Sequence, residues 1–266
     1  MDLFHALPAF GAAVAAGAIN SVAGGGTLVS FPTLIWLGLP STVANATSTV
    51  AIWPGSLGGM WGFRRELRTA DGSLWILLAP SLAGGIVGAL LLRVTPTHVF
   101  DRLVPMLILF ATLLFMAQEP VQRLFRRSRP NDAGRAEPSG SVDAPSHVTG
   151  TAAVIVFQLL VGVYGGYFGA GLGILMLAAL GVLGLSDIHQ MNGVKNLLTL
   201  CINGIASVCF IALGMVWWSD VVLMAIGAIV GGVGGAGAAR RIGRPAVRRI
   251  VIGIGLAMSA SLFLRR

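Results

Sequence analysis

Long apolar runs, separated by short polar stretches, are the feature of this sequence that most constrains its fold. They cover roughly residues 6–23, 27–39, 45–63, 73–92 and 99–117, and then 149–168, 172–185, 194–216, 220–239 and 247–264. Several are about 20 residues long, which is the length an α-helix needs to cross the roughly 30 Å hydrocarbon core of a bilayer. The sequence therefore predicts an all-α, polytopic membrane protein embedded in a lipid bilayer.

The basic residues lie mostly between these runs, although the chain carries a formal net charge of +8. Charged residues make up only 11% of the sequence, against about 25% in soluble domains. We therefore interpret the basic residues as topology signals and not as a nucleic-acid surface. With an outside N-terminus, 14 of the 18 Lys and Arg residues fall inside and 4 outside. The positive-inside rule then predicts both termini outside and a linker, 118–148, on the cytoplasmic side.

The second half of the chain resembles the first, and each half contains five apolar runs. The matching glycines are Gly24, Gly26, Gly84, Gly85 and Gly88, which recur 145 or 147 positions later as Gly169, Gly171, Gly231, Gly232 and Gly235. An odd number of crossings inverts the second copy, and inverted repeats are a transporter architecture with the substrate site near mid-membrane. We predict a first repeat over 1–117, the linker over 118–148, and an inverted second repeat over 149–266.

The second run of each half, 27–39 and 172–185, is short and follows a glycine break, "AGGGT" or "FGAGLG". At 1.5 Å per residue each covers only about 20 Å, so we expect broken or short helices at the centre of the fold. Whether these runs cross the membrane or fold back within it stays open. The free N–H groups and positive dipole of a helix start attract anions, and glycine allows close approach. For 84–88 and 231–235 we expect tight helix packing instead.

The third run of each half begins with matching polar residues, since Asn45 aligns with Asn192 and Ser48 with Lys195. Each asparagine either caps the helix that begins there or lines the site. Lys195 is the sole lysine and stands one turn into an apolar run. It either extends its amine to the lipid headgroups or faces a central cavity and attracts an anion.

The predicted substrate site combines the two breaks with these two helix starts. It comprises Asn20, Ser21, Gly24, Gly25, Gly26, Thr27, Asn45, Ser48, Gly169, Gly171, Asn192 and Lys195. The four histidines are scattered and pair with neither Cys201 nor Cys209 by spacing, so we predict no catalytic set, no metal and no cofactor. The two cysteines are interpreted as small packing residues, with a redox or metal pair as the alternative.

The ten acidic residues all fall in loops or at the ends of runs. No carboxylate lies near the middle of a run, where it could relay protons at mid-membrane as pumps and many symporters require. Moving one negative charge outward gains about 2.3 kcal/mol per 100 mV of inside-negative potential. An anion exporter therefore needs no coupling ion, and this is the direction we predict.

The stretches "GAINSVAGGGTLVSFPTLIWLGLPSTVANATSTVAIWPGSLGGMWGF" and "GVYGGYFGAGLGILMLAALGVLGLSDIHQMNGVKN" carry a family resemblance. They resemble the sulfite exporter TauE/SafE family of bacterial membrane permeases. The resemblance implies export of a small sulfur oxyanion, sulfite or an organosulfonate such as sulfoacetate, across the inner membrane. Together with the charge count, an inner-membrane location predicts both termini in the periplasm. A carboxylate exporter is the closest alternative, and a membrane scaffold without transport is a further one. The oligomeric state stays undetermined.

Overall fold

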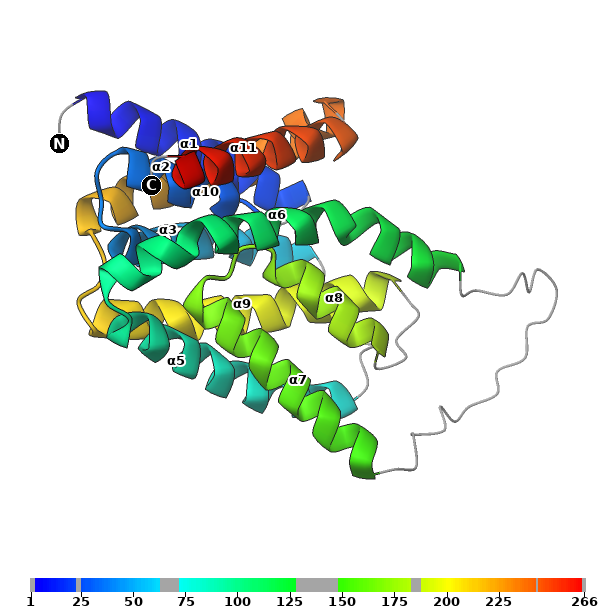
Figure 1. Cartoon of the computed structure of the whole chain (residues 1–266). Coiled ribbons are helices and arrows are strands. Elements are labelled where there is room, and N and C mark those ends of the chain that lie inside the picture. Colours follow the sequence, from blue (N-terminus) through cyan, green and yellow to red (C-terminus); the bar gives the residue numbers. More distant parts are fainter. Residues whose placement is uncertain are drawn as a thin grey trace.

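The computed structural model describes residues 3–22, 25–62, 72–127, 148–182, 188–242 and 244–264, which are helical apart from short connections (Figure 1). In chain order the elements are α1 (Leu3–Val22), α2 (Thr27–Trp36), α3 (Ser41–Gly62), the 3-10 helix η1 (Gly72–Leu77), α5 (Leu78–Val94), α6 (Thr97–Arg127), α7 (Val148–Tyr167), α8 (Leu172–Val182), α9 (Ile188–Ala212), α10 (Trp218–Ile242) and α11 (Arg244–Leu264). The described residues contain no strand, and the all-α prediction is confirmed.

Each apolar run is largely helical, but several helices extend beyond the run that they overlap. α3 begins at Ser41 and α9 at Ile188, several residues before the runs that start at 45 and 194. α6 continues to Arg127, past the end of its run at 117. An apolar run marks the part of a helix that suits hydrocarbon, whereas the backbone hydrogen bonds continue through polar turns at either end.

Three of the described helices are long and apolar enough to cross a membrane, over Trp75–Val94, Thr97–Ala117 and Met191–Ala212. Shorter apolar helices accompany them, among them Thr27–Trp36 and Leu172–Gly181. α2 and α8 are thus short, as their runs predicted, with 10 and 11 residues. At 1.5 Å per residue they measure about 15 Å, half of a bilayer core.

The two halves of the chain are interleaved through glycine contacts. α1 packs along α10, and α5 packs along α7. A Cβ added at Gly231 would meet the Val14 carbonyl, and one added at Gly162 would lie 3.0 Å from the Ser81 carbonyl. Because any larger residue would push these helices apart, the expected packing role of the glycines at 84–88 and at Gly231 is confirmed.

The last helices of the two halves, α6 and α11, pack in antiparallel fashion (Figure 1). Ser259 donates its hydroxyl to the Pro105 carbonyl at 3.0 Å, near one end of the contact. Arg248 donates to the Met116 carbonyl near the other end. α1 begins and α11 ends at one end of the bundle, whereas α6 ends and α7 begins at the opposite end.

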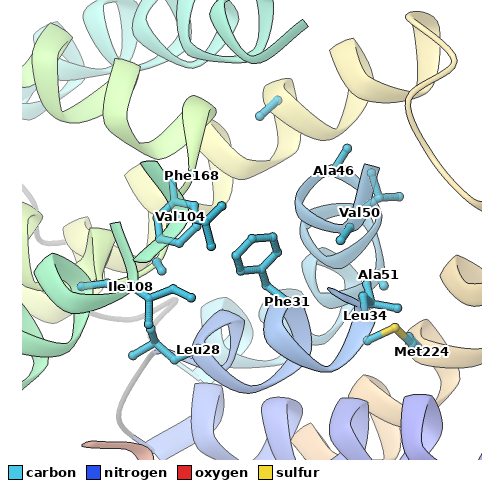
Figure 2. Packing of buried hydrophobic residues seen from close by; sticks show 14 of the residues in the cluster. Leu28, Phe31, Leu34, Ala46, Val50, Ala51, Val104, Ile108, Phe168 and Met224 are labelled. Atoms are coloured by element: carbon cyan, nitrogen blue, oxygen red, sulfur yellow. The ribbon is translucent and has the colours of Figure 1, made fainter. Parts of the chain in front are cut away.

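The centre of the bundle is packed around α2 (Figure 2). Phe31 is fully buried and contacts Phe168 edge to face, with ring centroids 5.4 Å apart. Leu28 and Leu34 of α2 are also buried, together with Ile108 of α6. α2 is therefore surrounded by other helices, which is why a helix of only ten residues holds its place.

Candidate functional site

The first break lies between α1 and α2 and is closed by the side chain of Asn20. Its carbonyl oxygen accepts the Gly25 N–H at 3.1 Å, and its amide nitrogen donates to the Ser56 hydroxyl at 3.4 Å. Gly25 has a φ of +129°, a conformation that favours glycine. Gly24 and the side chain of Ser21 lie outside the described residues.

The second break lies between α7 and α8 and has two residues in the left-handed region. Gly169 has a φ of +73° and Gly171 a φ of +76°. The Tyr164 hydroxyl donates to the Ala170 carbonyl at 2.6 Å and so spans the turn. The Leu172 N–H donates to the Gly169 carbonyl at 3.3 Å, which begins the new helix. Sequence reasoning placed both breaks at these glycines, and the backbone agrees.

Both breaks lie against the same stretch of α6. A Cβ added at Gly25 would lie 2.8 Å from the Phe115 ring. One added at Gly171 would lie 3.5 Å from the Ala111 carbonyl and from the Leu114 side chain. These α6 residues span about one helical turn. Two segments about 145 positions apart in sequence therefore meet at one place in the bundle.

The start of α8 carries a cationic neighbour. Lys195 is half-buried on α9, and its Cδ and Cε atoms lie 3.5 and 3.9 Å from the position of a Cβ added at Gly173. Gly173 belongs to the first turn of α8. Asn192 is also half-buried and precedes Lys195 by three positions, the spacing that puts two side chains on one helix face. Lys195 and Asn192 thus stand beside the second break.

The corresponding positions of the first half are neutral and closed by hydrogen bonds. Ser48 is fully buried, and its hydroxyl lies 2.7 Å from that of Ser30. Ser30 donates to the Gly26 carbonyl at 3.3 Å, and Gly26 directly precedes Thr27, the half-buried first residue of α2. The polar residues at this break are therefore largely paired with one another.

Asn45 is buried and joins the two halves. Its side-chain amide donates to the Tyr167 carbonyl at 2.9 Å, at the last residue of α7. The alternative that Asn45 and Asn192 cap their helices is wrong. α3 begins at Ser41 and α9 at Ile188, so both asparagines lie inside a helix.

Aromatic rings occupy part of the space near these groups. Phe31 and Phe168 fill the region between α2 and the second break, and Phe100 packs against Tyr167 with ring centroids 5.5 Å apart. The residues that have polar or glycine character are thus arranged around an aromatic centre, and Lys195 lies on its α8–α9 side.

Two relationships could not be found by sequence reasoning. The indole N–H of Trp53 donates to the Leu200 carbonyl at 3.1 Å inside the α3–α9 contact. His5 and Asp220 form a pair across the α1–α10 contact, with His5 Nε2 3.1 Å from Asp220 Oδ1. Neither pair leaves a local signal, since the partners are more than a hundred residues apart. Cys201 and Cys209 are both free thiols.

Comparison with known proteins agrees with this arrangement of apolar helices. The family model described as "Sulfite exporter TauE/SafE" matches residues 9–262. A probable membrane transporter protein of Haemophilus influenzae is 26% identical over 92% of this chain and 89% of its own length. The probable membrane transporter protein ORF9 of a Sinorhizobium species is 27% identical over 97% of this chain and 93% of its own length. The probable membrane transporter protein YfcA of Escherichia coli K12 is 24% identical over 95% of this chain and 87% of its own length.

No solved structure gives a significant match. The family match nonetheless covers nearly the whole sequence, and the relatives match along most of their own length. The chain therefore belongs to the sulfite exporter TauE/SafE family, and it is a multi-pass membrane transporter and not an enzyme.

Proposed function

We propose that this transporter exports a small sulfur oxyanion, sulfite or an organosulfonate such as sulfoacetate, across the bacterial inner membrane. The observation that carries the proposal is the position of Lys195, whose side chain lies against Gly173 in the first turn of α8, near the second glycine break. A helix start presents free N–H groups to an anion, and a cation next to it adds a full charge. Three oxygens on one sulfur suit several such donors at once.

The magnitudes indicate which of these groups dominates binding. A helix dipole contributes roughly 0.3–1 kcal/mol toward a nearby charge. Two unit charges 4 Å apart interact by about 4 kcal/mol at an effective dielectric constant of 20. Lys195 is therefore the principal attraction, and the breaks at Gly25–Gly26 and Gly169–Gly171 mainly supply space for a close approach to the backbone. The half of the site built from Ser30 and Ser48 is neutral, so it helps to define the shape of the site and adds no charge.

The proposal includes an inverted repeat, which matching helix ends support. α1 ends at Val22 and α7 at Tyr167, 145 positions later. α6 begins at Thr97 and α11 at Arg244, 147 positions later. The offsets equal those of the repeated glycines in the sequence.

Reciprocal contacts support the same arrangement. Gly84 faces the Leu159 carbonyl and Gly231 faces the Val14 carbonyl, which are matching pairs under these offsets. The equivalent helices α6 and α11 lie antiparallel, as copies of opposite orientation require. In such a fold the substrate changes sides as the two halves rock about a central site.

The direction of transport follows from charge. We infer that the termini are periplasmic, because the basic residues concentrate on the other side. Outward movement of a monovalent anion then gains about 2.3 kcal/mol per 100 mV of membrane potential. Export proceeds downhill without a coupled cation, and flux increases with an applied potential.

Efflux of sulfite from proteoliposomes under an imposed potential tests the function. We expect Lys195→Met to reduce efflux at low sulfite concentration by about 100-fold or more, given the size of the charge interaction. Lys195→Arg keeps the charge and retains much of the flux. Arg93→Met removes an exposed cation near the end of α5 and serves as the matched control. Unchanged efflux in Lys195→Met contradicts the proposed site.

Competition distinguishes substrate classes in the same assay. Excess unlabelled sulfoacetate should suppress sulfite efflux, whereas acetate and formate should have little effect. The reverse pattern identifies a carboxylate exporter. Absence of anion flux from the wild-type protein, with correct insertion shown by protease protection, favours a scaffold and rejects export.

A further inference from the structure

A histidine and a carboxylate meet at the end of the bundle where α1 begins and α11 ends. His5 on α1 places Nε2 3.1 Å from Oδ1 and 3.3 Å from Oδ2 of Asp220, in the first turn of α10. Asp220 is 0% exposed, and His5 is 26% exposed. The carboxylate is thus sealed from its surroundings, while protons still reach the imidazole.

This pair joins the two halves of the chain. α1 belongs to the first half and α10 to the second, and they pack along each other. At its other end α1 leads through Asn20 to the first break at Gly25. A change in the α1–α10 contact therefore reaches the site that we propose for the anion.

The surroundings of Asp220 offer it few other charges. Among the described residues, α1 carries no second titratable group, and α3, which also packs against α10, carries none. The arginines of α11 are Arg244, Arg248 and Arg249, all near its start, and Arg248 bonds to Met116 at the opposite end of the bundle. The positive end of the α10 dipole favours the carboxylate, and His5 is the charge partner on the neighbouring helix.

The charge of this contact depends on one proton. With a neutral imidazole, the pair contains a buried carboxylate whose charge is not compensated, and burial disfavours that state. With an imidazolium, the pair is neutral overall and its hydrogen bond is charge-assisted. Uptake of one proton at the imidazole therefore strengthens the α1–α10 contact.

We propose that His5 and Asp220 form a proton-binding site that holds the two halves of the transporter together at the face where the chain termini lie. A low pH on this face strengthens the contact and keeps the transporter closed on this side, which slows the release of substrate there. This inference rests on the proposed rocking of the two halves during anion export. It names the proton as a second ligand, bound away from the anion site.

Sulfoacetate efflux from proteoliposomes, with equal pH on both sides, tests the inference without a pH gradient. We use a sulfonate because its charge stays constant from about pH 8 to about pH 6, the range in which histidine titrates. Wild-type efflux should fall several-fold on this change. Efflux by His5→Gln and by Asp220→Asn should not change with pH and should equal the faster wild-type rate at about pH 8. Efflux by His5→Arg, which carries a permanent cation, should not change with pH either, but should equal the slower wild-type rate at about pH 6.

His98→Gln is the matched control, since His98 is exposed at the start of α6 at the same end of the bundle. It should keep the wild-type profile. A wild-type profile in His5→Gln, or a pH-dependent profile in His5→Arg, overturns the inference.

A second measurement separates this inference from the proposed function. The difference in melting temperature of the purified protein in detergent between about pH 6 and about pH 8 should depend on the His5–Asp220 contact. This difference should shrink in His5→Gln. An unchanged difference overturns the proton site whatever the transport assay gives. If wild-type efflux is absent but the difference shrinks, the export proposal fails and the proton site stands.

Discussion

Asn45 donates its side-chain amide to the Tyr167 carbonyl at 2.9 Å, so a residue of the first half holds the last residue before the break of the second half. This bond fixes the orientation of the amide. The side-chain oxygen of Asn45, Oδ1, is then buried and has no hydrogen-bond partner among the described residues. The bond is thus a single fixed point between two segments whose relative position defines the candidate site.

Asn45→Ala should destabilise the protein by about 1–3 kcal/mol, because it removes this bond and leaves the part-buried Tyr167 carbonyl without its donor. The melting temperature in detergent measures the effect. Thr33→Ala is the matched control, since the Thr33 hydroxyl bonds only within its own helix, to the Val29 carbonyl at 2.8 Å. Equal melting temperatures for the two variants would show that the Asn45–Tyr167 bond stabilises the protein no more than a hydrogen bond within one helix.

Substitution of the glycines in the two breaks should have unequal effects. Gly25→Ala meets both a φ of +129° and the Phe115 ring at 2.8 Å. Gly171→Ala meets only its φ of +76°, because the atoms around its Cβ position are no closer than 3.5 Å. We expect a loss of about 1–2 kcal/mol for Gly171→Ala, the cost of a left-handed alanine, and a larger loss for Gly25→Ala.

The double variant Gly25→Ala with Phe115→Leu separates the two contributions in the same unfolding measurement. Removing the ring should recover the steric part of the loss and leave the backbone part. If the leucine recovers nothing, the close approach of Gly25 to α6 does not limit the first break.

The sequence predicts the breaks well because their cause is local. A glycine that adopts a positive φ, followed by a short apolar run, is visible in the order of residues, and Gly25, Gly169 and Gly171 all fit this pattern. The helix starts at Ser41 and Ile188 were placed too late, since hydropathy does not report where backbone hydrogen bonding begins.

The partners of the site residues were beyond sequence reasoning. Asn45 bonds to Tyr167, 122 positions away, and His5 pairs with Asp220, 215 positions away. Which side chains meet depends on how the halves interleave, and no spacing within either half encodes this. Lys195 was singled out as the sole lysine, but its contact with the first turn of α8 follows only from the packing of α8 on α9.

Trp53 tests the contact between the third helices of the two halves. Its indole N–H donates to the Leu200 carbonyl at 3.1 Å, and its ring lies against Gly204. Trp53→Phe keeps most of the packing and should cost about 1 kcal/mol from the lost hydrogen bond. Trp53→Ala should cost about 3–5 kcal/mol. Trp218→Ala, at an exposed tryptophan, is the control. A similar melting temperature for all three variants would show that the Trp53 contact does not stabilise the protein.

Arg248 contacts α6 at a place where a proline interrupts the backbone hydrogen bonds. In a regular helix the Met116 carbonyl accepts the N–H of residue 120, but residue 120 is Pro and has no N–H. Arg248 donates to this carbonyl and also, at 3.4 Å, to the carbonyl of Phe115. The ring of Phe115 faces Gly25, so the guanidinium supports the part of α6 that meets the first break.

Arg248→Met should therefore destabilise the protein by about 1.5–3 kcal/mol, the contribution of a hydrogen bond from a charged group. Pro120→Ala restores the missing N–H, so the same Arg248→Met change should cost at least about 1 kcal/mol less in that background. A double-mutant cycle from unfolding in detergent measures the difference, with Arg249→Met, at an exposed neighbour, as control. If Arg248→Met costs the same with and without the proline, Arg248 stabilises α11 against α6 by some other contact, because only the Met116 carbonyl depends on residue 120.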